Sequence, residues 1–316
     1  MAEWSIAAVL KTVEGNTSGG SNPSLSADYT DGANPKSLHR FFIYLSHLTK
    51  QESTQLVGTH PGASIKEEET SDPNNHSMPK ERIFRFKQFA VSHSSAAMKV
   101  GTDGVMLGAW TPLPPVCRTI WDVGSGSGLI ALMLAQRHDL ADIRAIEIDS
   151  DAFGEMSQNL AASPWAERLH PVEGDICTMA GHLPPPDLIV SNPPFFANAL
   201  AAPDAARNAA RHEATLSFDS LIDIASRCLT PEGTLAMVSP ADRREDIEWS
   251  AAVRRMNIAR RTDIATIEGR QPSRTLWLLT RRDLPTIIDQ QAIRTADGLY
   301  TPWYRTLTED FYTHLK

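Results

Sequence analysis

The sequence predicts a doubly wound α/β fold in which a mostly parallel sheet carries an antiparallel strand at one edge. From Ile83 onward, short apolar segments alternate with helical segments, which is the pattern of a parallel sheet covered by helices. A glycine-rich turn, Asp122 to Gly128, joins a strand to a helix, and two adjacent strands close the pattern. A chain of 316 residues, 41% hydrophobic and 22% charged, has the composition of a globular protein that can bury a core of this kind.

The expected elements follow one another with short connections. Apolar runs of four to six residues are read as strands, and longer amphipathic runs as helices. In order they are strand 119–123, helix 128–137, strand 143–148, helix 151–162, strands 169–173 and 187–191, helix 218–229, strand 234–239, helix 243–256, and the strand pair 258–267 and 275–280. The segment Thr230-Pro231-Glu232-Gly233 is expected to end the helix before it, because proline and glycine break helices.

Residues 1–80 differ from residues 81–316, where the α/β domain is expected. They contain a Ser/Gly/Asn/Pro-rich stretch and an acidic run, Glu67-Glu68-Glu69, and we expect a disordered extension because little apolar surface can be buried there. A second hypothesis is that this segment is a translated tRNA gene. Permitted codons for Ala2 to Ala27 resemble the arms of a serine tRNA, and Met78 would then be the start of the protein.

The composition excludes several classes of protein. No stretch of about 18 uncharged apolar residues predicts a membrane helix, and the N-terminus does not resemble a signal peptide, so we expect a cytoplasmic protein with no membrane partner. Cys117, Cys177 and Cys228 form no C-x-x-C pair, and we expect them to be buried small apolar residues, with no metal site. We also expect a monomer.

The net charge of −8 gives no general case for nucleic-acid binding, but the charge is uneven. Five basic residues lie between Lys80 and Lys99 against one acid, and ten arginines lie between Arg243 and Arg282 against five acids. Such local patches can contact RNA phosphates. The alternative is that these side chains form an ordinary solvated helix face.

The turn Asp122-Val123-Gly124-Ser125-Gly126-Ser127-Gly128 predicts a cofactor site. Glycines permit a tight turn and the close approach of a ligand at a helix N-terminus. Glu147 closes the next strand about 20 residues later, where a carboxylate suits the hydroxyls of a ribose. The alternatives are a dinucleotide site and a turn without a ligand.

The glycine spacing and Asp122 favour S-adenosyl-L-methionine over a dinucleotide. A dinucleotide site has the spacing G-x-G-x-x-G, whereas this turn has G-x-G-x-G. Asp122 would attract the ammonium group of the methyl donor but would repel a pyrophosphate. Asp175 ends the third strand, where it could accept a hydrogen bond from an adenine amine, and Ile148 or Ile176 could pack on the adenine ring. A plain turn or helix cap is the alternative for Asp175.

Asn192-Pro193-Pro194-Phe195 directly follows the fourth strand and is the candidate catalytic motif. Two prolines fix the backbone, so the turn is rigid and its carbonyls stay outside any helix. The Asn192 side-chain oxygen and the Pro193 carbonyl could hold both hydrogens of a planar amine and direct its lone pair at a methyl group. Phe195 could stack on the base. Taken alone, Asn-Pro-Pro could be a simple turn.

Several segments resemble the bacterial tRNA (adenine-N6) methyltransferases that act on adenine 37 of a valine tRNA. The resemblance rests on the leader segments Phe86 to Phe89 and Ala97 to Trp110, on Ser163 to Arg168, and on the two motifs above, and it covers about residues 82–316. It implies a class I (Rossmann-like) methyltransferase fold with strand order 3-2-1-4-5-7-6. It also implies tRNA as the partner and the following site residues: Thr102, Asp103, Asp122, Gly124, Ser125, Gly126, Glu147, Asp175 and Ile176 at the methyl donor, and Asn192 to Phe195 at the target amine.

Position 195 departs from the adenine-specific pattern, which usually has Tyr there. Phe is more common in ribosomal-RNA guanine methyltransferases, which are therefore an alternative. Protein glutamine methyltransferases and a non-catalytic RNA-binding module are the others. Because Tyr and Phe both stack, the mechanism is the same in either case.

Overall fold

The computed structural model describes residues 83–93, 100–114, 116–194 and 216–314, all within the compact unit Glu68–Lys316. The segment 1–80, which the sequence predicts to be a disordered extension, and Phe195 lie outside the described residues. The domain boundary expected near residue 80 therefore stays a prediction.

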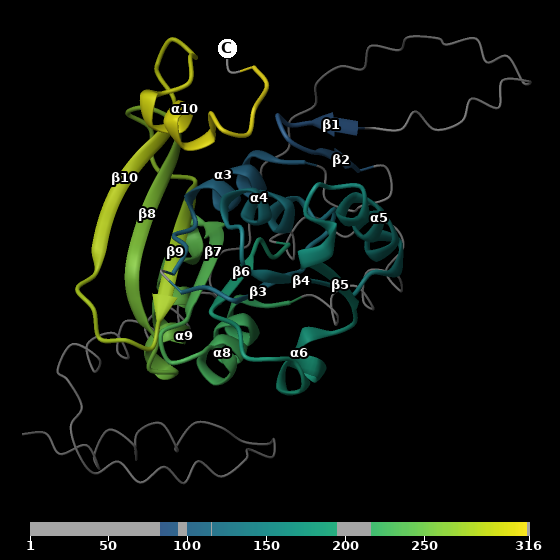
Figure 1. The fold of residues 1–316 in the computed structure, drawn as a ribbon. Coiled ribbons are helices and arrows are strands. Elements are labelled where there is room, and N and C mark those ends of the chain that lie inside the picture. Colours follow the sequence, from purple (N-terminus) through teal and green to yellow (C-terminus); the bar gives the residue numbers. More distant parts are fainter. Residues whose placement is uncertain (1–82, 94–99, 115, 195–215, 315–316) are drawn as a thin grey trace, which may run out of the picture. The chain divides into compact units, whose positions relative to one another are not determined.

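The described residues form an eight-stranded sheet with the order β10-β8-β9-β7-β6-β3-β4-β5 (Figure 1). Its strands are β3 (Thr119–Val123), β4 (Asp142–Glu147), β5 (Leu169–Glu173), β6 (Leu188–Ser191), β7 (Thr234–Pro240), β8 (Asn257–Ile267), β9 (Arg274–Thr280) and β10 (Ile287–Arg294). Strand β9 is antiparallel to β7 and β8, and all other neighbours are parallel. The predicted fold class is confirmed, and β10 extends the implied strand order by one further strand.

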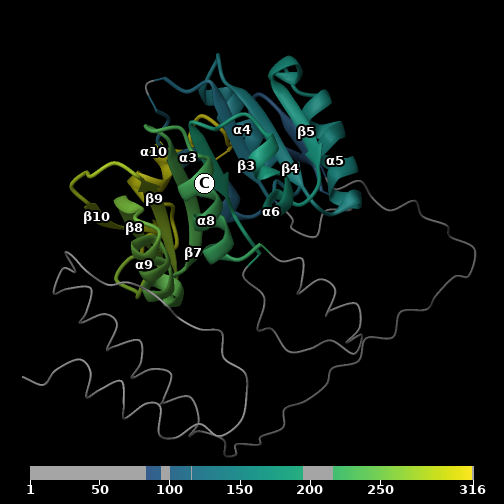
Figure 2. The ribbon, with the colours of Figure 1, turned by 90° about the horizontal axis from the view of Figure 1, so that it is seen from below.

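Helices cover both faces of this sheet. They are α3 (Thr102–Trp110), α4 (Leu129–Arg137), α5 (Ser150–Ala161), α6 (Ile176–Met179), α8 (Phe218–Cys228), α9 (Arg244–Val253) and α10 (Pro302–Thr308), with short 3₁₀ helices η1 (Ala166–Arg168), η2 (Ala180–His182) and η3 (Ala241–Arg243). Figure 2 shows α8 and α9 on the near side of the sheet when the molecule is seen from below. Several of these helices have a side-chain cap at the N-terminus. At α5, for example, the Asp149 carboxylate accepts a hydrogen bond from the Ala152 amide.

Two apolar cores follow from the alternation of strand residues between the faces of the sheet. Ile120 and Leu188 belong to the core that includes α3, α4 and α5, whereas their neighbours Trp121 and Ile189 belong to the core that includes α8 and α9. All four side chains have 0% exposure. Burial on both faces explains why these strands are continuous apolar runs in the sequence.

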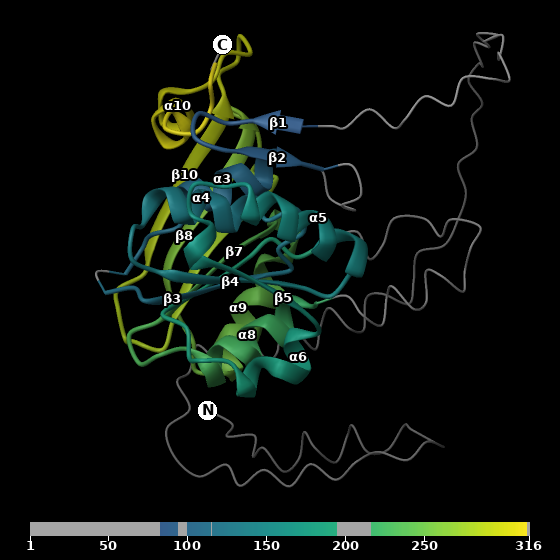
Figure 3. The same ribbon diagram turned by 45° about the vertical axis from the view of Figure 1, so that its right-hand side comes forward.

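The leader segment before α3 forms a small hairpin of β1 (Ile83–Arg85) and β2 (Ala90–Ser92). Phe86 forms a bridge with Tyr312, and the Lys87 amide donates to the Phe311 carbonyl at 2.8 Å. The hairpin therefore joins the two ends of the described domain, as Figure 3 shows beside α10.

Most expected boundaries agree with the structure to within one residue, but helix α9 is shorter than predicted. It was expected to span 243–256, and it spans Arg244–Val253. Arg255 has a φ of 55°, in the left-handed region, so the chain leaves the helix there and turns into β8.

The composition predicts that the chain has no membrane helix and that its three cysteines are buried. Across the described ranges, no helix combines the length and the apolar character that a membrane crossing requires. Of the three cysteines, Cys117 is buried, Cys228 is half-buried and Cys177 is exposed. The expectation of burial is therefore wrong for Cys177, because the first turn of α6 faces outward at that position.

Candidate active site

The glycine-rich turn and the Asn-Pro-Pro motif meet at the carboxyl ends of neighbouring strands. Strands β3 and β6 are parallel and adjacent, with Asp122 paired to Val190 in the register. The hydroxyl of Ser191, which has 0% exposure, donates to the Val123 carbonyl at 2.7 Å. This bond holds the end of β6 against the end of β3, so Asn192 follows directly beside Gly124.

Three glycines of the turn adopt backbone angles that favour glycine. Gly124, Gly126 and Gly128 have φ values of 69°, 58° and 80°. A Cβ added at Gly124 or Gly126 would meet no described atom within 4 Å, so the space above both residues is open. At Gly128, by contrast, a Cβ would lie 3.1 Å from Leu160, so this glycine permits α4 and α5 to pack closely.

Asp122 lies beneath the turn with 0% exposure. Its Oδ2 accepts hydrogen bonds from the Ser125 hydroxyl at 2.6 Å and from the Ala131 amide at 3.0 Å. Its Oδ1 is buried and accepts no hydrogen bond from any residue that the structure describes. Burial raises the pKa of Asp122 to about 7, and these two hydrogen bonds oppose the rise. Asp122 thus stabilises the turn through Oδ2, and its Oδ1 can accept a hydrogen bond from a ligand.

Glu147 ties the end of β4 to the same turn. Its Oε2 accepts from the Gly126 amide at 2.8 Å, and its Oε1 accepts from the Ile148 and Asp149 amides at 2.9 and 3.0 Å. A carboxylate has about four acceptor positions, and Oε2 receives one of these donors. Glu147 therefore fixes the turn and retains capacity for one hydroxyl donor.

Asp175 and Ile176 begin helix α6 beyond the end of β5. Asp175 is half-buried, and its Oδ1 caps the helix by accepting from the Cys177 amide at 2.8 Å. The cap proposed as the alternative role is therefore present, and Oδ2 is the oxygen that remains for a ligand. Ile176 is 4% exposed, whereas Ile148 is 46% exposed, so Ile148 offers the larger apolar surface at this edge.

The Asn-Pro-Pro motif packs against helix α3. Asn192 is half-buried, Pro193 is buried and Pro194 is exposed. The Nδ2 atom of Asn192 would lie 3.9 Å from a Cβ added at Gly104, an ordinary contact distance, so the Asn192 amide lies close to α3.

Helix α3 also carries Thr102 and Asp103, which were implied at the methyl donor. Thr102 is exposed, whereas Asp103 is half-buried and pairs with Arg274, Nε to Oδ2 at 2.8 Å. Arg274 begins β9 at the carboxyl edge of the sheet. The structure therefore gives Asp103 a role in fixing α3 beside Asn192.

Sequence reasoning did not identify Asn159, which joins the leader to the turn. From α5, its Oδ1 accepts from the Ser92 amide at 2.9 Å. Its Nδ2 donates to the carbonyls of Ser92 and Ser127 at 2.9 and 2.8 Å. A lone Asn in a helix has no sequence pattern that reveals partners so distant in the chain.

Comparisons with known proteins identify the family and the fold. The family model described as the Methyltransferase small domain matches residues 110–263. A tRNA1(Val) (adenine(37)-N6)-methyltransferase from Tolumonas auensis is 41% identical over 233 residues, covering 73% of this chain and 97% of the relative. The protein of the same name from Porphyromonas gingivalis is 44% identical over 243 residues, covering 73% of this chain and 95% of the relative.

The chain belongs to the tRNA1(Val) (adenine(37)-N6)-methyltransferase family. The predicted family and the prediction of a methyltransferase enzyme are confirmed. Among solved structures, a predicted O-methyltransferase from Agrobacterium tumefaciens superposes with a TM-score of 0.53 at 17% identity, covering 68% of this chain and 99% of that chain. This likeness supports the fold alone.

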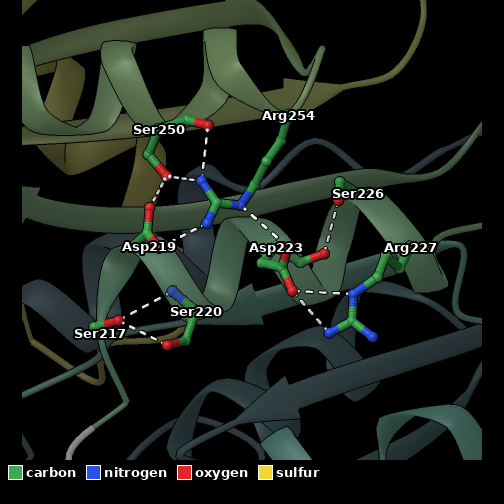
Figure 4. A network of polar contacts seen from close by, with 8 residues as sticks. All are labelled: Ser217, Asp219, Ser220, Asp223, Ser226, Arg227, Ser250 and Arg254. Carbon is green, nitrogen blue, oxygen red and sulfur yellow. Dashed lines mark hydrogen bonds and ion pairs between the residues drawn. The ribbon is translucent and has the colours of Figure 1, made fainter. Parts of the chain in front are cut away.

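Most arginines of the 243–282 segment of this methyltransferase are held in ion pairs. Arg254 bridges α9 to α8 through Asp219 and Asp223, at 2.6 and 3.3 Å (Figure 4). Six others pair with acids: Arg243, Arg244, Arg260, Arg261, Arg274 and Arg282. Seven of the ten arginines in this segment therefore have acidic partners within the described residues.

The described residues fit S-adenosyl-L-methionine as the methyl donor. The buried Oδ1 of Asp122 suits an ammonium group, the open space above Gly124 and Gly126 admits a ligand beside the backbone, and Glu147 can accept from a hydroxyl. Across the described part of the chain, no group of three or more His, Cys, Asp or Glu residues could hold a metal ion.

Proposed function

We propose that this enzyme transfers a methyl group from S-adenosyl-L-methionine to the exocyclic N6 amine of adenine 37 in tRNA1(Val). The observation that carries the proposal is the position of Asn192, held beside the glycine-rich turn by the Ser191 hydroxyl. The names of the relatives supply the identity of the tRNA and the nucleotide. A tRNA substrate also implies action in the cytoplasm.

The Asn-Pro-Pro turn holds the target amine. The lone pair of an aromatic amine is delocalised into the ring, so the nitrogen is a weak nucleophile. The Asn192 side-chain oxygen and the Pro193 carbonyl each accept one amine hydrogen, which draws the nitrogen towards tetrahedral geometry. Phe195, which lies outside the described residues, supplies the stacking face.

The turn after β3 holds the methyl donor opposite the amine. When bound, the donor supplies a methyl carbon on a positively charged sulfonium. Asp122 would attract the ammonium group, Glu147 would accept from the ribose, and Asp175 would accept from the adenine amine. Ile148 or Ile176 would contact the adenine ring, and the backbone of Gly124, Ser125 and Gly126 would line the site.

Mass spectrometry of nucleosides tests the identity of the base. The tRNA from a strain lacking this gene is expected to lose one N6-methyladenosine and to regain it on complementation. Loss of an N2-methylguanosine from ribosomal RNA would instead support the guanine alternative that Phe195 raises. Methylation of a glutamine in a protein would support the third candidate.

Substitution of Asn192 tests the catalytic role. Asn192→Ala is expected to lower kcat at least 100-fold, about 2.7 kcal/mol, while the Kd for the methyl donor stays unchanged. Asn192→Asp retains oxygen acceptors and is expected to keep more activity than the alanine variant. Asn257→Ala is the matched control, since that side chain only donates to the Arg282 carbonyl at the opposite edge of the sheet. Equal turnover of Asn192→Ala and wild type would contradict the role.

A further inference from the structure

A cavity of about 340 Å³ lies at the outer end of the sheet, between β8, β10 and the start of α10. Glu268, Gln290, Gln291, Thr301 and Trp303 are among its lining residues. The size is within the range of small-ligand sites, and a nucleobase fits within it. None of these residues belongs to the methyl-donor or amine site described above.

This cavity lies towards the edge of the sheet that carries Asn192, beside the last residues of β8 and β10. Strand β9 is antiparallel to both β7 and β8, so β8 runs in the same direction as β7 and β6. Strand β10 is parallel to β8. Glu268 directly follows the end of β8, as Asn192 directly follows the end of β6. Both sites are therefore at carboxyl ends of the sheet.

The separation of the two sites suits one strand of RNA. Three strand-to-strand steps lead from β6 to β8 and four lead to β10, which at about 4.8 Å a step gives roughly 14 to 19 Å across the sheet. Because β8 also runs beyond the level of Asn192, this distance is a lower bound. A stacked strand advances about 3.4 Å per nucleotide, so this span is about four to six nucleotides, and fewer where the bases are splayed.

The lining has the groups that recognise a base. Trp303 is half-buried and offers an indole face for stacking. Gln290 is exposed, and its amide has both a donor and an acceptor for a base edge. The Glu268 carboxylate accepts from exocyclic amines.

Two arginines flank the cavity and suit RNA phosphates. Arg270 is exposed in the turn two residues after Glu268. The Arg294 guanidinium lies over the Tyr300 ring, 4.2 Å from its centroid, at the end of β10. The nearby acids Glu268 and Asp297 balance these two charges, so the stacking and hydrogen-bonding groups of the lining, and not a net charge, favour a nucleobase.

We propose that this cavity binds a second nucleobase of the same RNA whose target adenine lies at Asn192. The inference rests on the proposed RNA substrate and adds a recognition site to it. The second base anchors the loop, so the enzyme reads more of the RNA than the methylated residue.

Fluorescence anisotropy with anticodon stem-loops tests the cavity without requiring turnover. Gln290→Ala is expected to weaken binding about fivefold, and Trp303→Leu about tenfold. Trp303→Leu keeps an apolar side chain against the core, and Gln290→Ala alters only an exposed residue. Gln158→Ala, an exposed glutamine on α5 at the other end of the sheet, is the control and is expected to bind as wild type does.

An abasic scan identifies the base. The binding of wild type and of both variants is measured with a series of stem-loops. Each stem-loop lacks one base, at a position up to about six nucleotides from the target adenine. One abasic position is expected to weaken wild-type binding about tenfold and to have no further effect in Trp303→Leu. Equal, additive losses at every position, or binding by both variants as tight as wild type, would overturn the cavity site. Methyl transfer to the intact stem-loop, measured separately, tests the proposed function.

Discussion

At the residue scale, Asp122 has a buried carboxyl group with a pKa raised to about 7 by desolvation. A raised pKa means that the folded protein binds this proton more tightly than the unfolded chain does. The group therefore favours folding at low pH, and its contribution is lost as pH rises from the unfolded value of 3.8 through about 7. Near pH 7, a small change of environment switches its charge.

The same carboxyl group predicts a pH dependence of donor binding. Because only the ionised form attracts an ammonium group, the Kd for S-adenosylmethionine is expected to fall as pH rises from about 6 to about 7. The expected slope is at most about tenfold per pH unit. Isothermal titration calorimetry across this range measures it.

Asp122→Asn supplies the control for this dependence. The amide cannot ionise but keeps an oxygen that can accept from Ser125 and Ala131, so the turn is expected to persist. Its donor affinity is expected to be weaker and flat with pH. An identical slope in both proteins would assign the titration to another group.

Residues differ in how far the sequence reveals them. Gly124 and Gly126 could be predicted because a left-handed backbone selects glycine, which leaves a visible pattern. Asn192 could be predicted because two prolines follow it. Ser191 and Asn159 could not, because a side chain that bonds to a distant carbonyl leaves no local pattern.

At the element scale, the leader strand β2 depends on helix α5. Asn159 satisfies both the amide and the carbonyl of Ser92, and the Ser92 hydroxyl donates to Glu155 at 3.1 Å. Because Asn159 also holds the Ser127 carbonyl, β2 and the glycine-rich turn are positioned by one side chain.

Removal of this side chain is expected to loosen both elements. Asn159→Ala leaves buried backbone groups without partners and is expected to lower the free energy of unfolding by about 2–3 kcal/mol, measured by urea denaturation. Donor affinity is expected to fall as the turn loses its restraint. Asn159→Asp is expected to be at least as damaging, because a carboxylate would face two carbonyl oxygens. Gln158→Ala, one residue away and exposed, should match wild type in both measurements.

The elements that the sequence predicts best are those buried on both faces. Strands β3 and β6 are short, almost fully buried runs, and their positions agree with prediction to within one residue. Strand β10 was not predicted, because Ile287–Arg294 is half polar and lies at the exposed edge of the sheet. The hairpin β1–β2 was also not predicted, since its three-residue strands are stabilised by Tyr312 and Phe311 from the far end of the chain.

At the scale of the whole molecule, we propose that residues 1–77 are dispensable. The Tolumonas auensis relative matches 233 residues of this chain, which are 97% of its own length. Deletion of residues 1–77 is therefore expected to leave kcat and KM within about twofold of the values for the full chain. The midpoint of unfolding is expected to stay unchanged. An inactive or unfolded product would show that the segment contributes to the domain.

The genomic DNA that encodes residues 2–27 tests the tRNA-gene hypothesis. A DNA sequence unable to form a cloverleaf would exclude it.

The bond from the Lys87 ammonium to the Glu309 carbonyl joins positions 222 residues apart. A ribosome adds about 5–20 residues per second, so on the order of ten to forty seconds pass between synthesis of these two positions. During that interval the nascent leader, with Phe84, Phe86 and Phe89, has no C-terminal partner to cover its rings. Until Tyr312 is synthesised, Phe84 and Phe86 therefore lack the aromatic partner that covers them in the folded domain.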